Sequence, residues 1–194
     1  MTSSPTWNRL RAVLLDDPER HPGRGQGRGL LPRHHARLCQ YAAVRHGGAA
    51  RQGGRFNRPG QEALYLALDE STALAEYKQD NPWLRPGTIC TFFVRELRVA
   101  DFSAGFDPER WPSLWADFAV DWRAEWFGKS VEPPTWYMAD DVVAEGLDGI
   151  LFPSQARPGG TNLVVYRSSA RPAAQLRVYD PDGALQKIAP PTGH

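Results

Sequence analysis

The sequence predicts a single α+β domain in which a mixed β-sheet is flanked by helices. Its 194 residues are 41% hydrophobic and 23% charged, which is enough apolar material for one core and too little charge for wholesale disorder. The expected strands and helices follow one another without the regular strand–helix–strand rhythm of a parallel sheet. No internal repeat is present. These observations favour α+β over a doubly wound or repeat architecture.

The N-terminal region is expected to be weakly structured up to about residue 30. Apolar residues at 10–15 could form a short amphipathic helix, whereas 21–29 contains four Gly and one Pro and is not expected to hold a regular element. A helix is expected at 32–44, with Pro32 in its first turn. These expectations divide the chain into a flexible Arg/Gly-rich segment 1–31, a folded domain 32–180 and a tail 181–194.

The middle of the chain alternates between strand and helix patterns. Residues 63–68 (ALYLAL) predict a strand, 69–71 a turn that caps the next helix, and 72–77 that short helix, with Glu76 near its centre. The β-rich run at 88–99 predicts a long, half-buried strand.

A helical stretch is expected from 107 to 127, ending at Gly128. Five aromatic residues in it recur at intervals of four, three, four and four, as on one face of a helix: Trp111, Trp115, Phe118, Trp122 and Trp126. A stripe of this kind is far more often a buried face than a surface for base stacking. We therefore interpret it as core.

The last part of the domain predicts one helix and three short strands. The helix is expected at 137–144, before Gly146, and the strands at 149–152, 162–166 and 176–179. A polar turn at 153–160 separates the first two strands.

Charge is distributed unevenly along the chain. Residues 1–60 hold eleven Arg and three acidic residues, a net charge of +8, whereas the remainder holds twelve basic and nineteen acidic residues, a net charge of −7. Such asymmetry is typical of a surface that meets an anion, whether nucleic acid, a phosphorylated small molecule or an acidic partner. A basic nucleic-acid-binding module without catalysis therefore stays open, although no recognition helix or aromatic strand motif accompanies the Arg residues.

Several function classes are not expected. Cys39 and Cys90 are too few for a disulfide scaffold or a four-cysteine zinc site, and we expect two reduced thiols. His34 and His35 are adjacent and lack a carboxylate or Cys at ligand spacing, so no metal site is expected. No apolar run approaches a membrane span and the N-terminus lacks the layout of a signal peptide, so we expect a cytoplasmic protein with no membrane partner.

One group of residues has the chemistry of a ligand site. The Gly53-Gly54 pair allows close approach of the backbone to a ligand, and Arg55 beside it suits a phosphate or a carboxylate. Tyr65 on the following strand and Glu76 on the following helix could share one cleft with Arg55. Each residue taken alone also has a structural explanation, as an ion-pair partner, a strand core residue or a solvated helix face.

A resemblance to a known family brings these residues together. Residues 53–60 (GGRFNRPG), 63–65 (ALY), 72–76 (TALAE) and 149–164, with Pro153-Ser154 and Asn162-Leu163-Val164, resemble the signature of the RES domain. That family is named for its Arg, Glu and Ser, which are Arg55, Glu76 and Ser154 here. The matched blocks lie within residues 45–166.

The resemblance implies an activity, a fold and a partner. RES proteins are toxins of bacterial toxin–antitoxin pairs with a fold similar to ADP-ribosyltransferases, and they degrade NAD⁺, some by phosphorolysis. The expected substrates are therefore NAD⁺ and, in a phosphorolytic enzyme, inorganic phosphate, with no prosthetic group. The expected partner is an Xre-type antitoxin that occludes the active site. One branch transfers ADP-ribose to a nucleotide-synthesis enzyme, so mono-ADP-ribosylation of a protein target is the alternative within enzymes.

The family chemistry and the residue types imply the same roles. Glu76 is expected to stabilise the oxocarbenium-like ribose that forms as nicotinamide leaves, and Tyr65 to stack on the nicotinamide ring. Arg55 is expected to hold the pyrophosphate or an incoming phosphate, and Ser154 to hydrogen-bond the ligand and Glu76. The expected ligand-contacting set is Gly54, Arg55, Asn57, Tyr65 and Ser154. We expect the side chains of Asn57 and Asn162 mainly to hold loops through bonds to the backbone.

Overall fold

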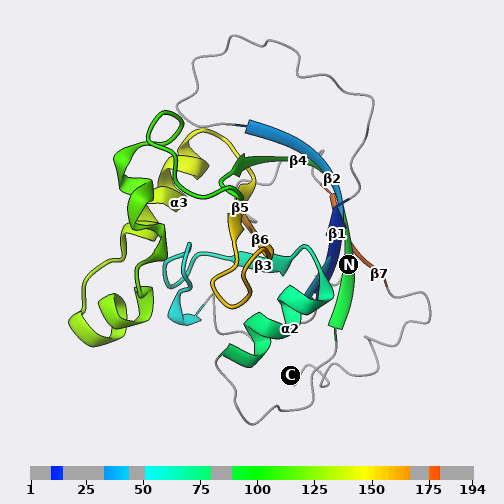
Figure 1. The fold of residues 1–194 in the computed structure, drawn as a ribbon, viewed down its shortest axis with the longest axis horizontal. Helices are drawn as coiled ribbons and strands as arrows, with labels where there is room; N and C mark the ends of the chain where they lie inside the picture. Colours follow the sequence, from blue (N-terminus) through cyan, green and yellow to red (C-terminus); the bar gives the residue numbers. More distant parts are fainter. Residues whose placement is uncertain (1–9, 15–32, 44–50, 80–88, 167–174, 180–194) are drawn as a thin grey trace, which may run out of the picture.

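The computed structural model describes residues 10–14, 33–43, 51–79, 89–166 and 175–179 (Figure 1). The glycine-rich run at 21–29 and the tail at 181–194 lie outside these residues, so the domain boundaries at 31/32 and 180/181 stay predictions. None of the helices in the described part is long and apolar enough to cross a membrane.

The described strands form one seven-stranded mixed sheet. Its order is β1-β2-β4-β5-β6-β3, with β7 also paired to β4. Every pairing is antiparallel except that of β4 with β5, which is parallel. The strands are β1 (Leu10–Leu14), β2 (Arg33–Ala43), β3 (Ala63–Ala67), β4 (Ile89–Asp101), β5 (Gly149–Pro153), β6 (Thr161–Tyr166) and β7 (Gln175–Tyr179). The predicted α+β class is confirmed.

Strand β4 is the long central element of this sheet. One of its edges pairs with β2 from Ala43↔Ile89 to Arg33↔Ala100. Its other edge pairs first with β7, through residues 91–95, and then with β5, through residues 99–101. The predicted strand at 88–99 is thus confirmed, and its length lets it join both halves of the sheet.

Both faces of the sheet are covered where β5 and β6 run. Ile150 and Val164 face a cluster that includes Phe102, Trp115 and Met138. Their neighbours along the strands, together with Leu97, belong to a second cluster on the opposite face. Alternate residues of a strand point to opposite faces, so these short strands are apolar at nearly every position because both faces are buried.

The described helices are α2 (Glu70–Gln79), the 3₁₀-helix η1 (Ser113–Ala119), the π-helix η2 (Ala124–Gly128) and α3 (Pro134–Ala144). Asp69 caps α2, because its Oδ1 accepts a hydrogen bond of 2.9 Å from the Thr72 amide. The predicted cap at 69–71 and the helices at 72–77 and 137–144 are confirmed, and each helix is longer than predicted.

Two helix predictions near the N-terminus are wrong. Residues 10–15 and 32–44 were expected to be helical, but Leu10–Leu14 and Arg33–Ala43 are strands. Leu10 to Leu14 pair with β2, and β2 pairs in turn with β4, whose paired residues lie 46 to 67 positions further along the chain. Pairing with distant strands overrides local helix propensity here, and apolar spacing within so short a segment fits either period.

The prediction of one continuous helix at 107–127 is also wrong, because the structure has two short irregular helical segments there. The stretch is divided into η1 and η2 by Val120, whose φ of −51° and ψ of 144° are extended. Asp121 then caps the second segment through hydrogen bonds of 3.1 Å from the amides of Arg123 and Ala124. The aromatic stripe is nevertheless largely core, as predicted, with Trp111, Trp115 and Trp122 buried. Cys90 is buried and forms no disulfide with another residue that the structure describes.

Candidate active site

The Gly-rich motif folds into a tight turn. The amide of Gly54 donates to the carbonyl of Asn57 at 2.9 Å, which places Arg55 and Phe56 at the tip of the turn. Phe56 is fully buried and packs edge-on against Phe152. A Cβ at position 54 would lie 2.7 Å from the Tyr65 hydroxyl and 2.5 Å from Asn57 Oδ1. Close packing beneath the turn therefore requires Gly54, whereas its contact with a ligand stays a prediction.

Tyr65 and Asn57 hold the turn from below. The Tyr65 hydroxyl donates to Asn57 Oδ1 at 2.8 Å and accepts from the Phe56 amide at 2.8 Å. Asn57 Nδ2 also donates to the carbonyls of Arg58 and Gln61, at 3.1 Å each. Burial raises the pKa of Tyr65 well above its usual value. The hydroxyl is thus a neutral structural group. Tyr65 also packs against the core cluster that contains Phe56, and its stacking on nicotinamide stays a prediction.

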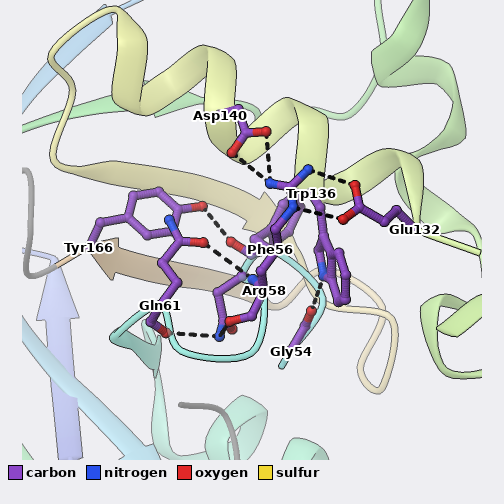
Figure 2. A network of polar contacts seen from close by, with 9 residues as sticks. Gly54, Phe56, Arg58, Gln61, Glu132, Trp136, Asp140 and Tyr166 are labelled. Carbon is purple, nitrogen blue, oxygen red and sulfur yellow. Dashed lines mark hydrogen bonds and ion pairs between the residues drawn. The ribbon is translucent and has the colours of Figure 1, made fainter. Parts of the chain in front are cut away.

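Three consecutive carbonyls of the turn each accept a side-chain hydrogen bond, and Figure 2 shows those at Gly54 and Phe56. Trp136 Nε1 donates to Gly54 at 2.8 Å, Thr135 Oγ1 donates to Arg55, and the Tyr166 hydroxyl donates to Phe56 at 3.0 Å. Two of these donors lie in the first turn of α3 and the third ends β6. The motif sequence gives no sign of these donors, which are 80 to 110 residues away.

Arg58 fastens the same loop to α3 (Figure 2). Its guanidinium donates to both oxygens of Glu132, at 2.9 and 3.2 Å, and to both oxygens of Asp140, at 2.7 Å. It also lies over the rings of Trp136 and Tyr137, 5.6 and 5.3 Å from the centroids. Hydrogen bonds to the two carboxylates raise the pKa of Arg58. Its charge is therefore neutralised by protein groups.

Arg55 has a different environment, since all its acceptors are neutral. Its Nη1 donates to the carbonyls of Phe118 and Val120, at 2.8 Å each, and its Nη2 donates to Gln155 Oε1. The two carbonyls lie where η1 ends and the chain becomes extended. The break in the predicted helix therefore supplies the acceptors that orient this guanidinium.

The charge of Arg55 is not balanced by a partner in the described part of the chain. No carboxylate there lies within ion-pair distance, and burial lowers the pKa of the guanidinium. Nη1 is committed to the two carbonyls, whereas Nε and one hydrogen of Nη2 have no acceptor among the described residues. A half-buried cation with unused donors on one edge suits an oxyanion ligand.

Glu76 is held through one of its two oxygens. Its Oε1 accepts 2.7 Å hydrogen bonds from both Ser154 Oγ and Asn162 Nδ2. Its Oε2 has no partner among the residues that the structure describes. The prediction that Ser154 bonds Glu76 agrees with this geometry. Asn162, expected to bond the backbone, instead bonds this carboxylate, because its buried amide faces α2 from β6.

The turn at 153–160 packs closely against the start of α2. A Cβ on Gly160 would collide with the Thr72 hydroxyl, and Arg157 Nη1 donates to that hydroxyl at 3.1 Å. Ser154 itself is fixed by two bonds: its amide donates to Gly160 at 2.8 Å and its Oγ accepts from the Arg157 amide at 3.0 Å. Gly160 thereby allows the turn to bring Ser154 to Glu76.

Two adjacent residues connect the cationic and anionic parts of the site. Ser154 donates to Glu76, and the next residue, Gln155, accepts from Arg55. Arg55 and Glu76 form no ion pair with each other, yet the carboxylate is near enough to favour the charged guanidinium electrostatically. The four residues predicted to be catalytic therefore lie together. No group of three or more His, Cys, Asp or Glu in the described ranges could hold a metal ion.

A known family model covers most of the chain. The family model of the RES domain matches residues 30–187. Among solved structures, the chain is similar to one described as the crystal structure of the M. tuberculosis MbcT–MbcA toxin–antitoxin complex. The two share 21% sequence identity, the similarity covers 81% of this chain and 89% of that chain, and the TM-score is 0.48. No curated protein matches the sequence.

Proposed function

The chain belongs to the RES domain family, and from that premise we propose that it is an enzyme that cleaves the bond between nicotinamide and ribose in NAD⁺. We propose further that it acts as the toxin of a toxin–antitoxin pair, with an Xre-type antitoxin as the protein that covers the site. One observation carries the catalytic proposal. Residues 154 and 155 link a guanidinium with unused donors to a carboxylate with one uncommitted oxygen.

Arg55 would hold a phosphate group of the substrate. Its Nη1 is already fixed by two main-chain carbonyls, so the guanidinium is oriented before a ligand arrives. Its Nε–H and Nη2–H edge can then donate to phosphate oxygens, which form stronger hydrogen bonds with a cation than neutral acceptors do. The same geometry serves the pyrophosphate of NAD⁺ or an attacking inorganic phosphate.

Glu76 would stabilise the charge that develops on the sugar. As the C–N bond to nicotinamide breaks, its electron pair leaves with the neutral base and positive charge grows on the ribose. A carboxylate beside that charge lowers the barrier, as carboxylates do in glycoside hydrolysis. Ser154 and Asn162 bind only Oε1, so Oε2 is the atom we assign to the ribose hydroxyls and the developing charge.

The acceptor of the ADP-ribosyl group defines the reaction type. Attack by phosphate, water or a side chain of a target protein would each follow the same cleavage, and each gives a product of different mass. Incubating the purified protein with NAD⁺, with and without inorganic phosphate, and analysing the products by mass spectrometry separates phosphorolysis, hydrolysis and protein modification. Release of nicotinamide supports the proposal. A wild-type protein that releases none under any of these conditions contradicts it.

A further inference from the structure

We propose that Gln155 is a specificity-determining residue of this site: its side-chain amide occupies the place on Arg55 that a phosphate oxygen of the ligand takes, and it is displaced when the ligand binds. This inference rests on the proposed function for the identity of the full substrate. Its ligand class is a phosphate oxyanion, either inorganic phosphate or the pyrophosphate of a dinucleotide.

The three acceptors around Arg55 differ in their ability to move. Those of Phe118 and Val120 are main-chain carbonyls at the end of η1, and both bind Nη1 at 2.8 Å. The third is the side chain of Gln155, which is exposed and lies in the turn between β5 and β6. Only this acceptor can leave by a side-chain rotation, without unfolding a segment of backbone.

The chemistry of the exchange favours an anion. Gln155 offers Nη2 a neutral amide oxygen, whereas a phosphate offers charged oxygens that form shorter and about twofold stronger hydrogen bonds. A phosphate can also bind Nε and Nη2 together, which a single amide oxygen cannot do. Because Arg55 has no carboxylate partner in the described chain, the incoming anion supplies the charge that the protein leaves unmatched.

The Gln155 side chain can rotate without moving Ser154 or Glu76, because the neighbouring residues are anchored. Ser154 is tied to Glu76 and to the Arg157 amide, so the backbone at 154 stays in place when the side chain of 155 rotates. Displacement of Gln155 therefore adds the second Nη2 hydrogen to the donors of Arg55 that are already open, and leaves the Glu76 carboxylate oriented. This makes position 155 a determinant of anion affinity that is separable from the catalytic carboxylate.

Two substitutions at position 155 test the proposal, because only one of them should weaken binding of the anion. Gln155→Glu places a carboxylate on Nη2, so we expect an ion pair with Arg55 that an anion must displace. Its Kd for inorganic phosphate, its KM for NAD⁺, or both, should rise at least tenfold, while its melting temperature stays equal or rises. Gln155→Ala leaves Nη2 open, so both constants should be unchanged or lower. Gln52→Glu, at an exposed position three residues before Arg55, makes the same charge change away from the guanidinium and should alter neither constant by more than twofold.

The measurements are calorimetric titration with inorganic phosphate and initial rates of nicotinamide release from NAD⁺. The ligand whose constant responds to Gln155→Glu identifies the source of the oxyanion. A structural role for Gln155 predicts weaker binding in both variants, and that result overturns the inference, as does a Gln155→Glu protein that matches Gln52→Glu with both ligands. If the wild type releases no nicotinamide but phosphate binding follows the predicted signs, the proposed function fails and the assignment of Gln155 stands.

Discussion

The substitution Glu76→Gln separates the charge of this side chain from its shape. In the wild type, Ser154 Oγ and Asn162 Nδ2 both donate to Oε1. A glutamine can accept both bonds only with its carbonyl oxygen in that place. Its NH₂ group then takes the place of Oε2, where it can neither accept from a ribose hydroxyl nor stabilise positive charge. The substitution thus replaces Oε2, the oxygen assigned to the substrate, and keeps the oxygen that Ser154 and Asn162 bind.

The size of the effect follows from the lost charge. A carboxylate about 4 Å from a unit positive charge contributes about 4 kcal/mol at an effective dielectric constant of about 20. Each 1.36 kcal/mol corresponds to about a tenfold change in rate, so kcat should fall about 10³-fold. The anchoring bonds survive in neutral form, and the free energy of unfolding should fall by only about 1 kcal/mol.

The assay is nicotinamide release from NAD⁺ at saturating substrate, with thermal unfolding measured on the same preparations. Glu109→Gln is the matched control, because Glu109 is exposed on the loop before η1 and makes no contact with the site. It should keep the wild-type rate. A Glu76→Gln protein that is folded and turns over within tenfold of the wild type would refute the role assigned to Oε2.

Three further substitutions test the supports of the site. Tyr65→Phe removes the hydroxyl that bonds both the Phe56 amide and Asn57 Oδ1, so the free energy of unfolding measured with denaturant should fall by about 1–3 kcal/mol, and an unchanged midpoint would contradict this. Asn162→Ala removes one donor from Glu76 and should lower kcat about tenfold with little change in KM, whereas the reverse pattern would count against a positioning role. Arg58→Ala should lower the melting temperature at pH 7, because it removes the ion pairs with Glu132 and Asp140, each worth no more than about 1 kcal/mol at this half-exposed site. The hydrogen bond from Arg58 lowers the pKa of Glu132, so this contribution is present above the unfolded pKa of about 4.3 and is lost as the pH falls through the lower folded value. A difference between wild type and variant that persists undiminished at pH 3 would argue against the pairing.

The parts of the fold that the sequence predicts are those decided by local pattern. The strands at 63–67, 89–101 and 149–153 are apolar runs bounded by turns, and α2 follows the cap at Asp69. The strands β1 and β2 were missed because their stability comes from pairing with each other and with β4, which no local window contains. The irregular helices at 113–128 were read as one helix because the aromatic spacing is helical on both sides of Val120.

The candidate site shows the same division. Arg55, Tyr65 and Glu76 were proposed from short motifs and Ser154 from the RES resemblance, and the structure bears out the expected bond between Ser154 and Glu76. The groups that orient them were missed. The hydrogen bonds of Arg55 to the carbonyls at 118 and 120 depend on a break in a helix, and those of the turn carbonyls depend on α3 and on the end of β6. Backbone acceptors carry no residue-type signal in a sequence.

The most direct test of the account compares nicotinamide release from NAD⁺ by the wild type, Arg55→Ala and Glu76→Gln over a range of NAD⁺ concentrations. Because the guanidinium is assigned to holding phosphate and the carboxylate to the breaking glycosidic bond, Arg55→Ala should chiefly raise KM and Glu76→Gln should chiefly lower kcat. A wild-type protein without turnover, or two variants that both retain its kinetic constants, would contradict a shared NAD⁺ site built from these two side chains.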